Sequence, residues 1–436
     1  MALPPHRAGT IPSLFARARR MPPQSVPAAR QPALPPHPAG RRDPAENTAA
    51  AHAWPADRQF QAGRLHAIDA SPARDAGGSA RSRAIPFIDR LRGVAAVVIM
   101  LHHLVGYVPA ADRSLPLPAV VHDAIYWHGG LAAQVFLVIG GFVGGLSLSR
   151  ATPSLGGLGR YLVSRYLRLA LPAAATLLAA ILASTVVPRA WSAFPLFDHF
   201  SWPAVVAHLL LVQDLLGYPS LLTGFWYLPI DWQCSGLLAL LFVAHAAIVR
   251  RHPGLGAAGR IATFLGLSLP VACLSLFSWN GDPAHEPFAT HYFGLVFLGA
   301  IGALAVVGRL PAAVFWGYAA ACAAAVVLRG RPQAAVALIA GVVIYLMARW
   351  TRPAPGRFNL LDGLGRISYS LFLVHYPTIW CMASLGRGLG GDDPAAVAAW
   401  TVASVPASLV AAVLLHRGVE LPAVALAGRF RERREP

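Results

Sequence analysis

The chain has 436 residues, of which 56% are hydrophobic and 13% are charged. This composition is typical of a multi-pass membrane protein and excludes an ordinary water-soluble enzyme. The 36 basic residues are all arginine and outnumber the 19 acidic residues, which gives a net charge of +17. Because the arginines cluster at the flanks of apolar segments, they indicate membrane topology and argue against nucleic acid as a partner.

Residues 1–84 form a separate region that is rich in proline, alanine and arginine and has no sustained apolar run. We predict a disordered cytoplasmic tail here, with a start codon further downstream as an alternative explanation. The region shows no apolar core of a secretory signal peptide, so we expect the first helix to stay in the mature protein. A membrane domain at 85–420 and an Arg-rich cytoplasmic tail at 421–436 follow.

Eleven apolar segments divide the membrane domain, and they are residues 85–108, 131–149, 168–187, 204–217, 225–249, 261–279, 288–307, 311–328, 334–350, 367–384 and 396–415. The segment 204–217 has only 14 residues, too few to cross about 30 Å of hydrocarbon. If it does not cross, most arginine clusters fall on the cytoplasmic side, with Arg329 and Arg331 as the main exceptions. We therefore predict an all-α fold of ten transmembrane helices with both termini in the cytoplasm.

The first apolar segment carries Arg92 and His103, eleven residues apart. On an α-helix this spacing places both side chains on one face, about 16 Å apart along the axis. A cation and an imidazole on a membrane-embedded face are costly, and such residues are functional candidates. The alternative is that Arg92 is a topology anchor and His103 an interfacial histidine.

Arg165 and Arg168 lie three residues apart at the cytoplasmic start of the third span. They share one helix face, where two guanidinium groups repel each other unless an anion lies between them. Arginine binds phosphate through two parallel hydrogen bonds, so the pair is a candidate phosphate site. The alternative is a cluster that only sets topology.

Further candidates lie in two later motifs. FWYLPIDWQCSG places Trp226 and Asp231 at the outer start of the fourth span, where an unpaired acid is expensive. LGRISYSLFLVHYP places Tyr369 and His375 in the ninth span. The alternatives are an aromatic belt with a solvated Asp231, and polar packing contacts between helices.

Other motifs indicate structure. The glycine-rich stretch 129–150 predicts close helix packing, since its glycines match no phosphate loop. Glu420 beside Arg417 predicts a structural ion pair. The four cysteines lie in or beside apolar runs without metal-site spacing, so we expect neither a metal nor disulfides.

Together these motifs resemble the acyltransferase 3 family of integral membrane O-acyltransferases. The resemblance rests on FIDRLRGVAAVVIMLHH, VFLVIGGFVGGLSLSR, RYLVSRYLRLALP, FWYLPIDWQCSG, HYFGLVFLGAIGALA, LGRISYSLFLVHYP and GVELP. It implies ten membrane helices, an acyl-CoA donor, a carbohydrate or other hydroxyl acceptor, and the cytoplasmic (inner) membrane of a bacterium. The family's Arg-x10-His element falls on Arg92 and His103, and its Arg-x-x-Arg element on Arg165 and Arg168.

This chain departs from the family pattern at several positions. Asp231 stands where the family often has Glu, and Pro229 where it has Ser. The serine usual in the second helix is replaced by Ile139 or Gly140. We do not expect the hydrolase-like domain that some members carry after the last helix.

The residues and the resemblance predict one mechanism. The phosphates of acyl-CoA would dock on Arg165, Arg168 and Arg92. We take acetyl-CoA as the default co-substrate and expect no permanently bound cofactor. The pantetheine arm would follow the helix face to His103. A neutral histidine there would act as general base for the acceptor hydroxyl.

Asp231 or Asp89 would orient or charge-balance this histidine, and Asp231 is a candidate catalytic residue beside it. Asp89, Trp226, Tyr369 and His375 are candidate substrate-binding residues. The alternative function is a transporter or flippase of a glycan or lipid intermediate, although no internal repeat supports it. A non-catalytic membrane scaffold is a second alternative, and the oligomeric state is left open.

Overall fold

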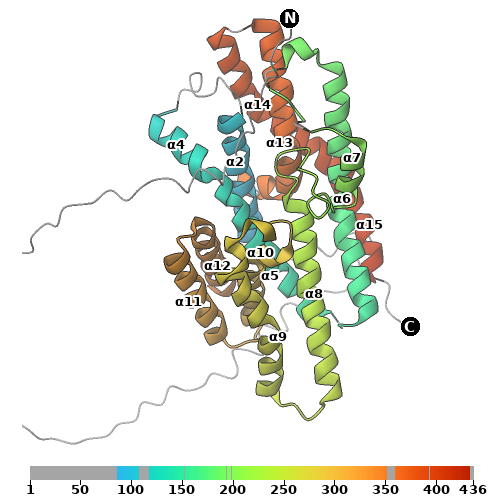
Figure 1. Ribbon diagram of the computed structural model, residues 1–436, viewed down its shortest axis with the longest axis vertical. Coiled ribbons are helices and arrows are strands. Elements are labelled where there is room, and N and C mark those ends of the chain that lie inside the picture. The colour runs from blue at the N-terminus through green and yellow to red at the C-terminus, as the bar shows by residue number, and fades with distance from the viewer. Residues whose placement is uncertain are drawn as a thin grey trace, which may run out of the picture. The chain divides into compact units, whose positions relative to one another are not determined.

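The computed structural model describes residues 86–107, 117–151, 153–192, 194–197, 199–350, 359–391 and 393–432 (Figure 1). The predicted tail at 1–84 and the end of the C-terminal tail lie outside these residues. The described part is helical and contains no strand, which confirms the all-α prediction. The elements are α2 (Pro86–Tyr107), α4 (Ala119–His128), η2 (Gly129–Ala132), α5 (Ala133–Arg150), α6 (Leu155–Val186), η3 (Arg189–Trp191), α7 (Trp202–Leu209), α8 (Tyr227–Arg251), α9 (Ala257–Phe277), η4 (Trp279–Gly281), η5 (Pro283–His285), α10 (Ala289–Val306), α11 (Ala312–Arg329), α12 (Pro332–Trp350), α13 (Leu360–Gly390), α14 (Pro394–Leu415), the π-helix η6 (His416–Glu420) and α15 (Leu421–Glu432).

Each of the ten predicted spans lies on its own long helix: α2, α5, α6 and α8 to α14. Eight helical segments of the described residues are long and apolar enough to cross a membrane. These segments include neither α2 nor α13, whose polar residues lower their hydropathy, so the count of ten is not confirmed. The protein is a multi-pass membrane protein of apolar helices.

The most deeply buried helix is α10, with 14 of its 18 residues buried. It packs against α5, α8, α9, α11 and α12. A side chain at Gly141 of α5 would overlap the carbonyl group of Val296, and one at Gly299 of α10 would overlap that of Val138. The glycines therefore let the two backbones touch, as the sequence predicts for 129–150.

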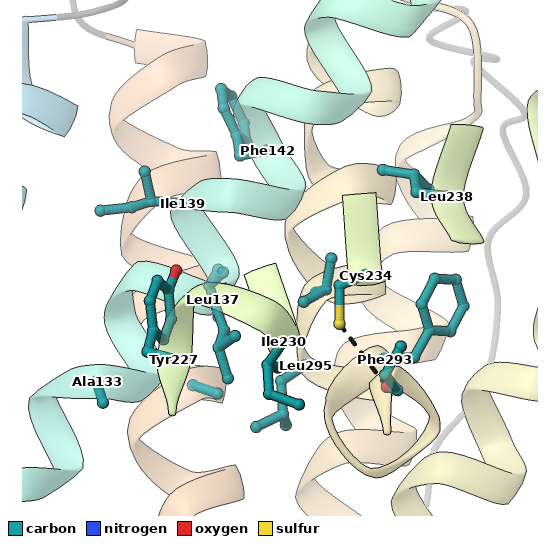
Figure 2. Close-up of a cluster of buried hydrophobic side chains, with 14 of the residues drawn as sticks. Ala133, Leu137, Ile139, Phe142, Tyr227, Ile230, Cys234, Leu238, Phe293 and Leu295 are labelled. Atoms are coloured by element: carbon teal, nitrogen blue, oxygen red, sulfur yellow. Dashed lines mark hydrogen bonds between the residues drawn. The ribbon is translucent and has the colours of Figure 1, made fainter. Parts of the chain in front are cut away.

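Side chains of three helices meet in one buried cluster beside this contact (Figure 2). Leu137 and Phe142 come from α5, Tyr227 and Ile230 from α8, and Leu295 from α10. The cluster holds the start of α8 against α5. As a result Tyr227 and the residues one turn beyond it have fixed positions inside the protein.

Two helices distant in sequence, α2 and α13, pack closely and in parallel. Gly93 faces Leu364 and Gly365, and a side chain at Gly365 would overlap the carbonyl group of Asp89. Arg90 and Asp362 form an ion pair at 2.6 Å across the same interface. The pairs Arg90–Asp362 and His103–His375 share a sequence separation of 272, so the two helices run in the same direction with a constant offset.

The segment predicted to stay on one side of the membrane contains only the short helix α7, which has 8 residues. An eight-residue helix is about 12 Å long, well short of the hydrocarbon thickness. Residues 210–226 then turn back without regular helix. His208 ties the two parts together, because its Nδ1 donates to the carbonyl of Ala204 at 2.7 Å and its Nε2 accepts from the backbone N–H of Leu221 at 3.0 Å.

The parallel packing of α2 and α13 also indicates whether residues 202–226 cross the membrane. Two helices that cross a membrane in the same direction need an odd number of crossings between them. The seven helices α5, α6 and α8 to α12 satisfy this condition only if residues 202–226 do not cross. The helix packing and the arginine distribution thus favour the same topology.

A reporter experiment tests this topology. A fusion partner active only outside the cytoplasm should stay inactive after Pro436 and be active in the loop at Asp282–His285. The expected result follows from the predicted cytoplasmic placement of the arginine clusters and the short segment 204–217. An active C-terminal fusion would contradict it.

Candidate active site

His103 of α2 lies against His375 of α13 in the protein interior. Nδ1 of His103 is 2.6 Å from Nε2 of His375, and the two ring planes differ by only 5°. His103 is 8% exposed and His375 is completely buried. Nδ1 of His375 in turn donates to the carbonyl oxygen of Leu371 at 2.9 Å. The structure thus joins two residues that the sequence predicted for separate roles.

Aromatic rings connect this histidine pair to the start of α8. Phe372, one turn before His375, lies with its ring centroid 5.6 Å from that of Tyr227 and 5.9 Å from that of Phe136. Tyr376 presents its ring edge to His103, at a centroid distance of 6.3 Å and an angle of 78°. These large side chains hold the imidazole rings in place and keep the surroundings apolar.

One turn beyond Tyr227, Asp231 forms a buried ion pair with Arg165 of α6. Nη2 of Arg165 donates to Oδ1 of Asp231 at 2.6 Å, and Nε donates to Oδ2 at 3.1 Å. The two side chains are 18% and 8% exposed. Asp231 therefore balances the charge of Arg165, whereas Nδ1 of His103 is bound by His375.

Gly140 of α5 adjoins this ion pair. A Cβ at Gly140 would lie 3.2 Å from Oδ1 of Asp231 and 3.7 Å from Nη2 of Arg165. A side chain at position 140 would thus lie beside the carboxylate, and Gly140 has none.

The remaining predicted residues are distributed around these two pairs. Arg92 is partly buried and lies on α2, the helix that carries His103. Arg168 is exposed and lies on α6, three residues after Arg165.

Three other candidates lie at contacts between helices. The hydroxyl group of Tyr369 donates to the carbonyl of Leu169 at 2.7 Å, which anchors α13 to α6. Trp226 packs against the ring of Tyr292 at a centroid distance of 5.9 Å. Asp89 lies where α2 touches Gly365, at the opposite part of α2 from His103.

Sequence reasoning missed a polar network near the end of the chain. Glu420 Oε2 accepts hydrogen bonds from Ser370 at 2.7 Å and from Nδ1 of His416 at 2.8 Å. These are its recorded partners, in place of the pairing with Arg417 expected from the sequence. The i, i+4 spacing of His416 and Glu420 was a signal for this contact, whereas Ser370 is brought in only by the fold.

Two polar residues that were not predicted from the sequence lie in residues 210–226. Gln213 is 1% exposed, and its Oε1 has no hydrogen-bond partner among the described residues. Burial raises the pKa of the neighbouring Asp214 carboxyl group to about 6. No motif indicated these residues, because a short apolar segment does not reveal which of its polar side chains face inward.

The sequence profile of the acyltransferase 3 family, described as an acyltransferase domain, matches residues 85–417. The chain belongs to this family. No curated protein and no solved structure gives a significant match. The family match covers most of the chain and includes both histidines and the Arg165–Asp231 pair. Together with the apolar helices, it makes the protein a membrane acyltransferase and confirms the resemblance drawn from the motifs.

The ion pair yields a testable prediction about stability. Asp231→Asn and Arg165→Gln should each lower the free energy of unfolding by about 3–5 kcal/mol, because each leaves a buried charge without its partner. The double variant should lose less than the sum of both. Thermal unfolding in detergent measures all three.

The half-exposed pair Arg90–Asp362, with side chains 39% and 29% exposed, is a matched control. Its single variants should lose much less stability than those at positions 165 and 231, since water screens the charges. Additive losses at positions 165 and 231 would contradict a direct interaction there.

Proposed function

We propose that this protein is an O-acyltransferase of the bacterial inner membrane, with both termini in the cytoplasm. It would move an acyl group, acetyl by default, from acyl-CoA to a hydroxyl group of a cell-envelope polysaccharide, glycolipid or similar acceptor. The observation that carries the proposal is the buried His103, held at Nδ1 by His375 inside the family's domain. A positioned imidazole is the usual general base for a hydroxyl nucleophile near neutral pH.

Arginines would bind the donor. The phosphates of CoA cannot enter hydrocarbon, so they would meet the exposed Arg168 and the partly buried Arg92. The bonds from Arg165 to Asp231 use Nε and Nη2, so its Nη1 donors would be available to a phosphate. Asp231 would then act through Arg165 by holding its guanidinium group in position.

A single base is sufficient for the acyl transfer, because it takes a proton from the acceptor and gives it to the leaving group. The acceptor oxygen attacks the thioester carbonyl carbon while its proton passes to His103. The tetrahedral intermediate then expels the CoA sulfur as the C–S bond breaks. His103 returns the proton to that sulfur, so the products are the ester and free CoA. Because α2 is continuous from Pro86 to Tyr107, Arg92 and His103 lie about 16 Å apart, which suits an extended pantetheine arm.

The acceptor would meet aromatic and polar side chains near the start of α8. Trp226 packs with Tyr292, and aromatic faces with nearby polar groups are common in ligand sites. We assign Trp226 to the surroundings of the acceptor on this basis. The acceptor class is identified by comparing envelope glycans of the wild-type and deletion strains by mass spectrometry.

Replacement of the base tests the proposed function directly. His103→Ala should lower acyl transfer about 10²–10⁴-fold, the contribution of a positioned general base, with normal expression and insertion. The assay measures label from radioactive acetyl-CoA that enters glycans in membranes of the producing strain. His102→Ala, at the neighbouring position of α2, should be the milder change. Near-normal turnover of His103→Ala would contradict the assignment, and transport without labelled product would favour the flippase alternative.

Replacement of an exposed arginine tests donor binding. Arg168→Gln should raise the KM for acetyl-CoA about tenfold or more, the loss expected for a hydrogen bond between charged groups, with little effect on acceptor KM. Arg168→Lys should be intermediate because it keeps the charge and loses the planar fork. Arg260→Gln, at an exposed arginine of α9, is the control. An unchanged donor KM in Arg168→Gln would leave Arg168 as a topology signal.

A further inference from the structure

We propose that His375 is a positioning residue that fixes the tautomer of His103, so that Nε2 of His103 is the nitrogen that accepts the proton. The catalytic part of this inference rests on the proposed function. The tautomer itself follows from hydrogen bonds alone and can be measured without any turnover.

A backbone carbonyl can only accept a hydrogen bond, and one such carbonyl fixes the hydrogen on His375. Nδ1 of His375 lies 2.9 Å from the carbonyl oxygen of Leu371, so Nδ1 carries the hydrogen and donates it. A neutral imidazole has one N–H, so Nε2 of His375 carries a lone pair. Nδ1 of His103 lies 2.6 Å from that Nε2 and must therefore be the donor. The lone pair of neutral His103 is then on Nε2.

The positions of the two rings allow Nδ1 of His103 to donate to Nε2 of His375, and the packing around His375 restricts its ring. The ring planes are 5° apart and the centroids 4.9 Å apart, so an in-plane N–H of one ring can point at the in-plane lone pair of the other. His375 is completely buried on α13, and Phe372 lies against it at a centroid distance of 6.3 Å. A ring flip would place a C–H group where the buried hydrogen bond is now made.

Two other titratable groups of this part of the protein, His102 and Asp231, have described partners of their own. His102 lies with its ring centroid 5.2 Å away, but its Nδ1 donates to the carbonyl oxygen of Ile125 at 3.1 Å. Asp231 is bound to Arg165. The Nδ1 partner of His103 is therefore a neutral ring. When His103 takes up a proton at Nε2, His375 can accept the Nδ1–H more strongly and share the positive charge toward the carbonyl of Leu371.

Two substitutions separate positioning from packing. His375→Leu keeps a large apolar side chain but removes the acceptor, so kcat should fall about 10–100-fold, the usual cost of losing the group that orients a functional histidine. The KM for acetyl-CoA should change less than about twofold, because the donor arginines are untouched. His375→Gln offers a carbonyl oxygen to the Nδ1–H of His103 and should recover part of the lost kcat.

His245→Leu is the matched control, since His245 lies on α8 against Phe264 at a centroid distance of 5.6 Å, away from both catalytic candidates. It should insert and turn over like the wild type. Equal kcat in His375→Leu and wild type would overturn the inference, as would equal losses in the Leu and Gln variants.

Nitrogen-15 NMR of histidine-labelled wild-type protein in lipid reads the tautomer directly. The expected spectrum shows a protonated Nδ1 and an unprotonated Nε2 for His103, assigned by their loss in His103→Ala. A protonated Nε2 would overturn the inference even if every variant is active. If the wild type transfers no acyl group, the proposed function fails, whereas the NMR result still decides the role of His375. If a His375 variant fails to insert into the membrane, the NMR spectrum of the wild type still decides the role of His375.

Discussion

Gly93 and Gly365 let the backbones of α2 and α13 approach more closely than any larger residues would allow. The ion pair Arg90–Asp362 holds the same interface near its beginning. Because both helices rise by the same amount per residue, this alignment carries forward to every later pair with the same offset. His103 and His375 are ten residues beyond the two glycines and meet at 2.6 Å. The histidine contact is thus set by the glycine contact.

The second polar pair shows how a charged site is tolerated inside an apolar bundle. An isolated carboxylate or guanidinium group in this environment would be very costly. Arg165 and Asp231 remove most of that cost by forming two parallel hydrogen bonds. Each residue is therefore held in place by the other, while the apolar cluster of α5, α8 and α10 beside them excludes water (Figure 2).

Much of the helical framework could be predicted from the sequence because hydrophobic runs, arginine flanks and glycine spacing are local signals. The face shared by Arg92 and His103 follows from helix periodicity alone. The partner of His103 could not be predicted, since His375 is 272 residues away and no local pattern encodes that contact. The partner of Asp231 was hidden for a related reason. Arg165 lies ten residues into α6 and Asp231 only four residues into α8, so the two meet only because α8 begins beside the first part of α6.

The π-helix η6 changes which side of the last helix faces its neighbours. A π-turn adds one residue to an α-helical rod, which rotates everything after it by about 100° around the axis. Before this turn, α14 packs on α13, and after it, α15 packs on α6. One nearly continuous rod therefore serves two neighbours with two different stripes of side chains. Glu420 lies at the point of rotation and is bound by His416 and Ser370. Because Ser370 belongs to α13, a single carboxylate attaches the π-turn to the helix that carries His375.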